Sequence, residues 1–151
     1  MKTQFDILKK SRELTLKAIE GLTIAQLHAI PEGFKNNIAW NVAHMVVTQQ
    51  LLQYKLSGLD VLVPDELIEE NRKGTFPTKK FTEEEFEEVK ELFIGLPDTL
   101  RDDFEGGIFE NYQEYPTSTG FILDSFDTAI HFNNYHEGLH LGIILSIKKV
   151  V

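Results

Sequence analysis

Hydrophobic positions recur with a helical period in four blocks of the chain. Apolar residues repeat every three or four positions over Thr3–Ile19, from about Asn37 to Ser57, from Thr82 onward, and from about Ser118 to Lys149. Prolines and glycines separate the blocks, and no pair of alternating strands with a hairpin signature is evident. The pattern predicts an all-α four-helix bundle in a single domain spanning residues 1–151.

Capping residues indicate where two of these helices begin and end. Asn36 or Asn37 can cap the second block, and Gly58 can terminate it. Thr82 and Glu85 form a capping-box pattern at the start of the third block. The second block therefore runs for about 20 residues.

The connections between the blocks differ in length. A short helical turn is expected over 23–28, and residues 59–81 predict a long crossover with one helical turn near 66–71. Pro97 is expected to kink the third helix or to split it. Residues 106–116 have no clear period and predict an irregular segment.

Charge and composition exclude several classes of protein. The formal net charge is −9, and residues 60–127 carry 19 of the 24 acidic residues but only 6 of the 15 basic ones. No basic stripe is present, so we expect no nucleic-acid partner. No signal peptide or long apolar run is visible, so we expect a soluble, cytoplasmic protein with no membrane partner. The absence of cysteine excludes disulfides, thiolate nucleophiles and Cys-ligated metals.

Two histidines of the fourth block have the spacing of a metal site. His136 and His140 are four residues apart, so they lie about 6 Å from each other on one helix face. The same face continues through Ile144 and Ile147, which indicates that both imidazoles point toward the core. A divalent ion can bind one nitrogen of each ring.

A third inward histidine strengthens this interpretation. His44 lies on the apolar stripe of Trp40 and Leu51 in the second block. One such histidine is more often a hydrogen-bonded core residue, but three from two helices match the ligand set of catalytic metal sites. His131 should point elsewhere on its helix, and His28 is expected at the surface or as a cap.

The stretch from His136 to His140 also fits the H-E-x-x-H pattern of zinc proteases. Such enzymes need a third ligand downstream, and none of the eleven residues after His140 is His, Asp or Glu. A protease is therefore disfavoured. Glu137, as a general base, and Asn41 are retained as candidate catalytic residues, and Trp40, Asn41, Asn133 and Glu137 as candidate pocket walls.

Gly138 and Gly142 lie on the helix face opposite the two histidines. Glycine is unfavourable within a helix by about 1 kcal/mol relative to alanine. Close approach of a helix from a second subunit and internal packing within one bundle both explain these residues, and the sequence does not choose between them.

Two segments carry a resemblance to a known family. The stretch Asn37-Ile38-Ala39-Trp40-Asn41-Val42-Ala43-His44 resembles the histidine-bearing second helix of the DinB superfamily, the DinB/YfiT-like proteins. The stretch His136-Glu137-Gly138-Leu139-His140-Leu141-Gly142-Ile143 resembles its last-helix motif, H-x-x-x-H-x-G-x-I. The order and length of the helices match as well, so the resemblance covers nearly the whole chain.

The resemblance implies a four-helix bundle of DinB/YfiT type with a divalent metal, nickel or zinc, held by His44, His136 and His140. It also implies a homodimer. Characterised relatives include S-transferases and isomerases that use a low-molecular-weight thiol. This chain departs from the family at Leu141 and Ile144, where Arg or Gln often stands near the final glycine.

Three functional hypotheses follow. The first is a metal-dependent thiol S-transferase or hydrolase, whose sulfur nucleophile must come from a thiol cosubstrate; the acidic part of the chain argues mildly against an anionic thiol. The second is a non-enzymatic, dimeric, stress-related metal-binding or interaction module. The third is a bundle whose histidines are only hydrogen-bonded.

Overall fold

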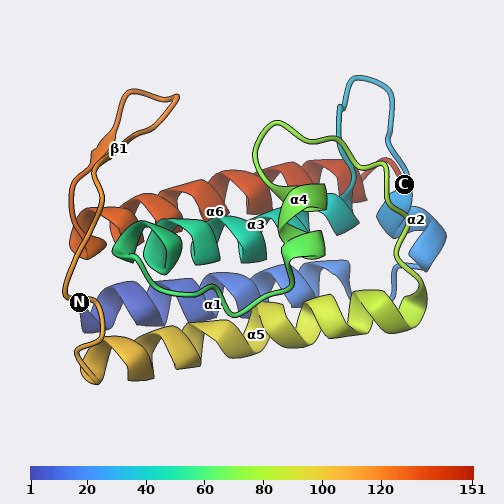
Figure 1. The fold of residues 1–151 in the computed structure, drawn as a ribbon. Coiled ribbons are helices and arrows are strands. Elements are labelled where there is room, and N and C mark those ends of the chain that lie inside the picture. The colour runs from blue at the N-terminus through green and yellow to red at the C-terminus, as the bar shows by residue number, and fades with distance from the viewer.

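Four long helices form the bundle in the computed structural model, which describes residues 1–151. They are α1 (Lys2–Ile19), α3 (Ile38–Gln53), α5 (Glu83–Glu105) and α6 (Phe126–Lys148). Helices α1 and α6 run in one direction and α3 and α5 in the other, as Figure 1 shows. Helices α1 and α3 each pack against both α5 and α6. The all-α bundle predicted from the sequence is confirmed.

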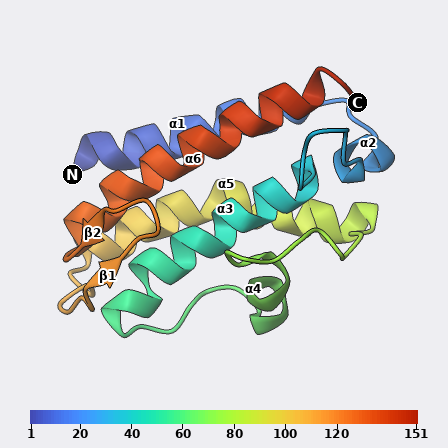
Figure 2. The same ribbon diagram turned by 90° about the horizontal axis from the view of Figure 1, so that it is seen from above.

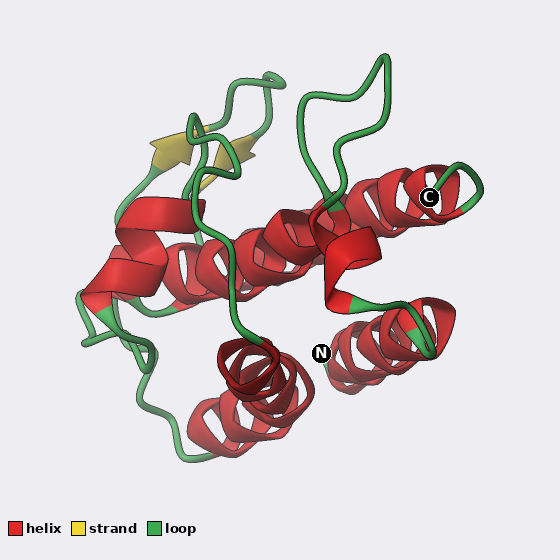
Figure 3. Ribbon diagram, turned by 90° about the vertical axis from the view of Figure 1, so that its right-hand side faces the viewer, coloured by secondary structure: helices red, strands yellow, loops and turns green.

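Short helices and a two-stranded hairpin lie along one side and at the ends of this bundle. They are α2 (Ile24–His28), the 3-10 helix η1 (Lys55–Ser57), α4 (Asp65–Asn71), β1 (Tyr115–Pro116) and β2 (Ile122–Leu123), most of which Figure 2 labels. The helical turns expected near 23–28 and 66–71 are confirmed as α2 and α4. Figures 1 and 3 show that the hairpin and the crossover loop after α4 project on the same side of the bundle.

The predicted start of the last helix at Ser118 is wrong, as is the expectation of no hairpin. Strands β1 and β2 pair in antiparallel fashion across 117–121. Thr117 closes the turn because its backbone N–H and its hydroxyl both donate to the carbonyl of Phe121, and Gly120 takes the left-handed φ of +88° that the turn requires. Helix α6 begins only after Ser125, whose hydroxyl accepts from the N–H of Thr128.

Pro97 does not split the third helix, which runs unbroken from Glu83 to Glu105. A proline has no N–H, so the carbonyl four residues earlier, that of Phe93, loses its helical partner. The Arg12 guanidinium fills this gap, since its Nη1 donates to the Phe93 carbonyl at 2.9 Å. A side chain of α1 therefore supplies the hydrogen bond that the proline removes.

Helix α3 is buried on nearly all sides, whereas the sequence predicted a single apolar stripe. Fourteen of its sixteen residues are buried, because α4 and the crossover cover the side that the other long helices leave open. The helix is also shorter than predicted. It ends at Gln53, and η1 then leads to Gly58 with φ of +76°. Asn37 caps its start by accepting from the N–H of Trp40 at 2.8 Å.

The apolar core has two parts. A larger cluster surrounds the first half of α3 and includes Phe93 and Ile144; a smaller one at the other end includes Phe5 and Ile130. Along α1 and α6 the residues between the two clusters include buried polar side chains. A layer of buried polar side chains therefore separates the two apolar clusters.

No helix has both the length and the apolar character needed to cross a membrane.

Candidate metal centre

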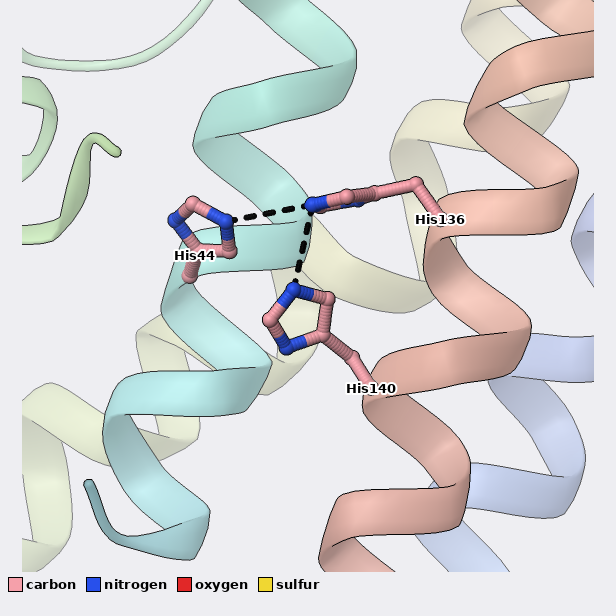
Figure 4. Close-up of side chains that lie close together, drawn as sticks. All are labelled: His44, His136 and His140. Atoms are coloured by element: carbon pink, nitrogen blue, oxygen red, sulfur yellow. Dashed lines mark hydrogen bonds between the residues drawn. The ribbon is translucent and has the colours of Figure 1, made fainter. Parts of the chain in front are cut away.

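The imidazoles of His44, His136 and His140 converge at the centre of one side of the bundle. His44 comes from α3, while His136 and His140 lie one turn apart on α6, as Figure 4 shows. The Nε2 atom of His136 lies 3.3 Å from Nε2 of His44 and 3.1 Å from Nε2 of His140. The potential ligand atoms of the three residues all lie within 4.8 Å of one another. The structure therefore brings together the three residues predicted as ligands.

Aromatic neighbours hold two of these rings in place. The indole of Trp40 stacks on the His44 ring with centroids 4.5 Å apart and planes 9° apart. The ring of Phe132 stacks more loosely on His136 at 6.2 Å. Both contacts join residues four apart on one helix, a spacing that puts side chains on the same face. The sequence of each helix thus restricts the orientation of its own histidine.

In His44 and His140, hydrogen bonds at Nδ1 determine which ring nitrogen carries the proton and which one can bind a metal ion. Nδ1 of His44 lies 2.7 Å from the carbonyl of Asn71, and Nδ1 of His140 lies 2.7 Å from Oδ1 of Asn41. The Asn41 amide nitrogen already donates to the Asn37 carbonyl, so its oxygen is the atom that faces His140. Both partners can only accept, so both rings carry their proton on Nδ1. Their Nε2 atoms therefore present lone pairs, which is the arrangement found in histidines that bind metals.

The three rings by themselves leave one converging nitrogen without a proton, and only the Thr48 hydroxyl, 3.3 Å from Nε2 of His44, can supply it. The Nε2 atom of His136 has two neighbouring lone pairs, those of His44 and His140, and one N–H can be donated to only one of them. Nδ1 of His136 is buried and has no hydrogen-bond partner. A divalent cation would accept all three lone pairs at once. Three nitrogens about 2.0–2.1 Å from a tetrahedral ion lie about 3.3 Å apart. The two separations that involve His136, 3.3 and 3.1 Å, are close to this value.

The electrostatic environment keeps the three rings neutral. Burial, with smaller contributions from neighbouring imidazoles, lowers the pKa of His136 and of His140 to about 3. Burial also lowers the pKa of His44, against the opposing effect of its hydrogen bond to Asn71. Neutral imidazoles are the form that binds a metal ion. The donor set and its charge state therefore fit a divalent ion.

A cavity of about 380 Å³ opens onto the three histidines. Its apolar wall is formed by residues from α3, η1 and α6, namely Leu51, Leu52, Leu56 and Phe132. Its polar wall includes Thr48, whose hydroxyl lies 3.3 Å from Nε2 of His44, and residues of the hairpin. A cavity of this size accommodates a small organic molecule. The histidines are therefore accessible to a ligand.

Sequence reasoning missed most of this wall. Thr48 and Leu51 follow His44 at four and seven positions, so helical spacing could have found them. The hairpin residues Thr117–Thr119 could not have been found, because Ser118 and Thr119 were assigned to the last helix and no hairpin was expected. None of the four pocket residues expected from the sequence lines the cavity. Trp40 and Asn41 lie behind the histidines instead, as their contacts show.

Glu137 points away from the histidines and toward α1. Its carboxylate, 1% exposed, forms an ion pair with the fully buried Arg12 guanidinium at 2.8 Å, and Arg12 Nε lies 3.1–3.2 Å from both oxygens. The side-chain amide of Asn133 donates to the same carboxylate at 3.0 Å. Glu137 therefore contacts a buried cation on a different face of α6 from the one that carries the histidines.

The two remaining histidines lie outside the site. His131 is exposed, and its Nδ1 lies 2.7 Å from the carbonyl of Asp127 within its own helix. His28 is partly buried and accepts the N–H of Phe81 at 2.8 Å, which ties the end of the crossover to α2. Neither residue is near the converging nitrogens, as the sequence predicted.

Comparison with known families relates the chain to one of them over most of its length. The model of the DinB superfamily matches residues 7–144, a range that includes all three converging histidines and parts of all four long helices. A search of curated proteins finds no match.

Proposed function

Because the chain belongs to the DinB superfamily and brings three imidazole nitrogens together, we propose that His44, His136 and His140 hold one divalent metal ion. The convergence of three Nε2 atoms, two of them with their Nδ1 protons held by oxygen acceptors, is the observation that carries this proposal. Imidazole nitrogen suits zinc and nickel, and these are the ions we propose.

We further propose that the protein is a metal-dependent thiol S-transferase or hydrolase. An ion held by three neutral imidazoles acts as a Lewis acid and lowers the pKa of a water or thiol bound at its open position. The chain has no cysteine, so in the transferase form a low-molecular-weight thiol supplies the sulfur. The cavity beside the histidines supports an enzyme over a purely structural metal site, which would be closed.

The chain's own residues then have distinct roles. Asn41 and the Asn71 carbonyl orient the rings of His140 and His44. The Thr48 hydroxyl lies at the cavity wall, where it can hydrogen-bond a group bound near His44. We assign Glu137 a positioning role, since its carboxylate holds α6 against α1 through Arg12 and does not reach the cavity.

We also propose a homodimer that forms through the exposed face of α6. Gly138 and Gly142 are exposed, and a Cβ built at either position meets no atom within 4 Å, so internal packing does not explain them. Tyr135, Leu139 and Leu145, on the same helix, are each more than 40% exposed. A helix of a second copy could approach the two glycines closely and cover these side chains.

The cytoplasmic location stays a prediction.

Metal content tests the first proposal. Untagged protein, loaded with zinc or nickel and dialysed without chelator, should hold about one ion per chain by elemental analysis. His136→Ala should lose it. His131→Ala is the matched control, because it removes an exposed histidine of the same helix outside the site. Retention of the ion by His136→Ala, or sub-stoichiometric metal in the parent, would contradict the proposal and favour histidines that are only hydrogen-bonded.

Turnover separates the enzyme from the non-enzymatic module. Metal-loaded protein should accelerate transfer of a small thiol onto an electrophile such as monochlorobimane, or hydrolysis of an activated ester, and His44→Ala should abolish this. Stoichiometric metal without acceleration of any such reaction would favour the binding module.

Light scattering tests the proposed dimer. Leu139→Glu should dissociate it, whereas Leu14→Glu, which alters an equally exposed leucine of α1, should not.

A further inference from the structure

The cavity beside the histidines has an unusual charge for this protein. The chain carries 24 acidic residues, yet no carboxylate lines the cavity. Apart from the three histidines, which are neutral, the only charged side chain in its wall is that of Lys73. The acidic excess of residues 60–127 therefore does not extend to the mouth of the site, and the local charge is positive.

The Lys73 ammonium has no acidic partner within 4.0 Å, in contrast to several other lysines. Lys79 lies within that distance of three glutamates, and Lys9 pairs with Asp98 at 2.6 Å. An ammonium that is already paired offers little attraction to a ligand. Lys73 is free to attract one.

Hydrogen bonds connect the segment that carries Lys73 to α3, the helix that carries His44. The Asn71 carbonyl accepts from Nδ1 of His44 at 2.7 Å, and the Thr75 hydroxyl accepts from the indole N–H of Trp40 at 3.1 Å. Between these points, Gly74 takes a left-handed φ of +91°. The backbone of Lys73 is thus fixed on both sides, which keeps the Cα from which its flexible side chain extends at a constant place relative to the histidines.

The hairpin adds hydroxyl groups to the same cavity. Thr117, Ser118 and Thr119 all line it. The Thr117 hydroxyl already donates to the Phe121 carbonyl, and the Thr119 hydroxyl lies 3.1 Å from it. The Ser118 hydroxyl makes no hydrogen bond within the chain, so it is the one free to bind a ligand. Hydroxyl donors beside a lysine can complete the coordination of an anionic oxygen.

We propose that the cavity binds a small organic monoanion whose carboxylate pairs with the Lys73 ammonium and accepts a hydrogen bond from the Ser118 hydroxyl. This inference rests on the proposed function, because a second group of the same molecule would reach the metal at the histidines. The apolar wall formed by Leu51, Leu56 and Phe132 contacts the carbon skeleton between the two groups. One lysine without a second cation matches a single negative charge, which favours a carboxylate over a dianionic phosphate. Lys73 is then a residue that determines substrate specificity.

A pair of probes that differ only in charge tests this proposal. Zinc-loaded protein is titrated calorimetrically with 3-mercaptopropionate and with its neutral counterpart, 3-mercapto-1-propanol. The parent should bind the carboxylate at least about threefold more tightly, the size expected for one partly screened ion pair. Lys73→Ala should remove this preference without changing the affinity for the alcohol, and Lys73→Glu should reverse it. Lys149→Ala, which removes an exposed charge outside the cavity, should retain it.

The outcomes separate this inference from the proposal on which it rests. Equal affinity for the two probes in the parent, or an unchanged preference in Lys73→Ala, would overturn the role of Lys73 and leave the metal site intact. Failure of the parent to bind zinc, or to bind either thiol, would overturn the proposed function and this inference with it. Added salt should reduce the preference, because it screens charges at the cavity mouth.

Discussion

Two polar clusters meet on α6 at consecutive residues, and they differ in how their polar atoms are satisfied. Glu137 points toward α1, where Arg12 and Asn133 donate to its carboxylate in a sealed interior. His136, its neighbour in the chain, points toward α3, where three Nε2 atoms face one another with too few protons to share. In the first cluster the Arg12 and Glu137 side chains are fully paired, and only Oδ1 of Asn133 lacks a partner. In the second cluster Nδ1 of His136 lacks a partner, the lone pairs of His44 and His140 converge on one nitrogen, and the rings open onto a cavity.

The difference shows how structural and functional polar groups can be told apart within one core. A buried ion pair with good geometry holds two helices in register, but removal of one partner leaves an unpaired charge. A cluster of converging lone pairs, by contrast, is suited to bind a cation, which can accept all of the lone pairs at once. Burial alone would not have separated Glu137 from His44, since both are less than 5% exposed.

The largest expected effect comes from breaking the ion pair. Glu137→Ala should lower the free energy of unfolding by about 3–5 kcal/mol, because it leaves the Arg12 guanidinium buried without its carboxylate. Chemical denaturation measures this. Asp98→Ala, which breaks the exposed pair with Lys9, is the control and should change stability by less than about 1 kcal/mol. Similar losses in the two variants would mean that the buried pair is not the anchor between α1 and α6.

The next largest expected effect is the stabilisation of the folded protein by bound zinc. With free zinc at about 100 times the dissociation constant, the parent should gain about 2.7 kcal/mol of stability, since the ion binds only the folded state. His44→Ala should gain far less from zinc. In chelator it should be less stable than the parent by about 1–3 kcal/mol, because it removes the ring that stacks on Trp40 and leaves the Asn71 carbonyl without its donor. Thermal denaturation with and without zinc measures both. A gain from zinc in His44→Ala equal to that of the parent would show that His44 is a core residue and not a ligand.

A smaller effect is expected from the amide that orients His140. Asn41→Ala should weaken metal binding about 10- to 100-fold, because the Nδ1 proton of His140 loses its acceptor. Competition with a chromophoric chelator measures the affinity. Asn36→Ala, which removes a hydrogen-bond partner of Asn41 but not of the histidine, should have a much weaker effect. Equal effects of the two variants would argue against an orienting role.

The smallest effect is a dependence of stability on pH in the metal-free protein. The folded-state pKa values of His136 and His140, about 3, lie below the unfolded value near 6.5. Protons therefore bind the unfolded state first, and stability should fall as the pH drops. The loss for the pair is about 1 kcal/mol or less between pH 7.5 and 6.5 and grows at lower pH. Denaturation in chelator at several pH values measures it, and a double His136→Ala, His140→Ala variant should lose most of this slope.

Much of the fold and the ligand set could be predicted from local patterns. The i, i+4 spacing of His136 and His140, the Asn37 cap and the capping box of Thr82 are properties of single helices, so neighbouring residues reveal them. Local rules failed where a distant partner intervenes. Pro97 leaves its helix intact because Arg12 replaces the lost hydrogen bond, and no feature near residue 97 indicates that.

The amino-acid sequence determined the four helices and the face of α6 that carries two imidazoles, because helical period and capping act over a few residues. Tertiary structure alone decided that Glu137 would pair with Arg12, that Asn71 and Asn41 would set the tautomers, and that a crossover and a hairpin would bring Lys73 and Thr117 to one cavity. These contacts join residues from different helices and loops. They depend on how the elements pack, and no periodicity within one element encodes that arrangement.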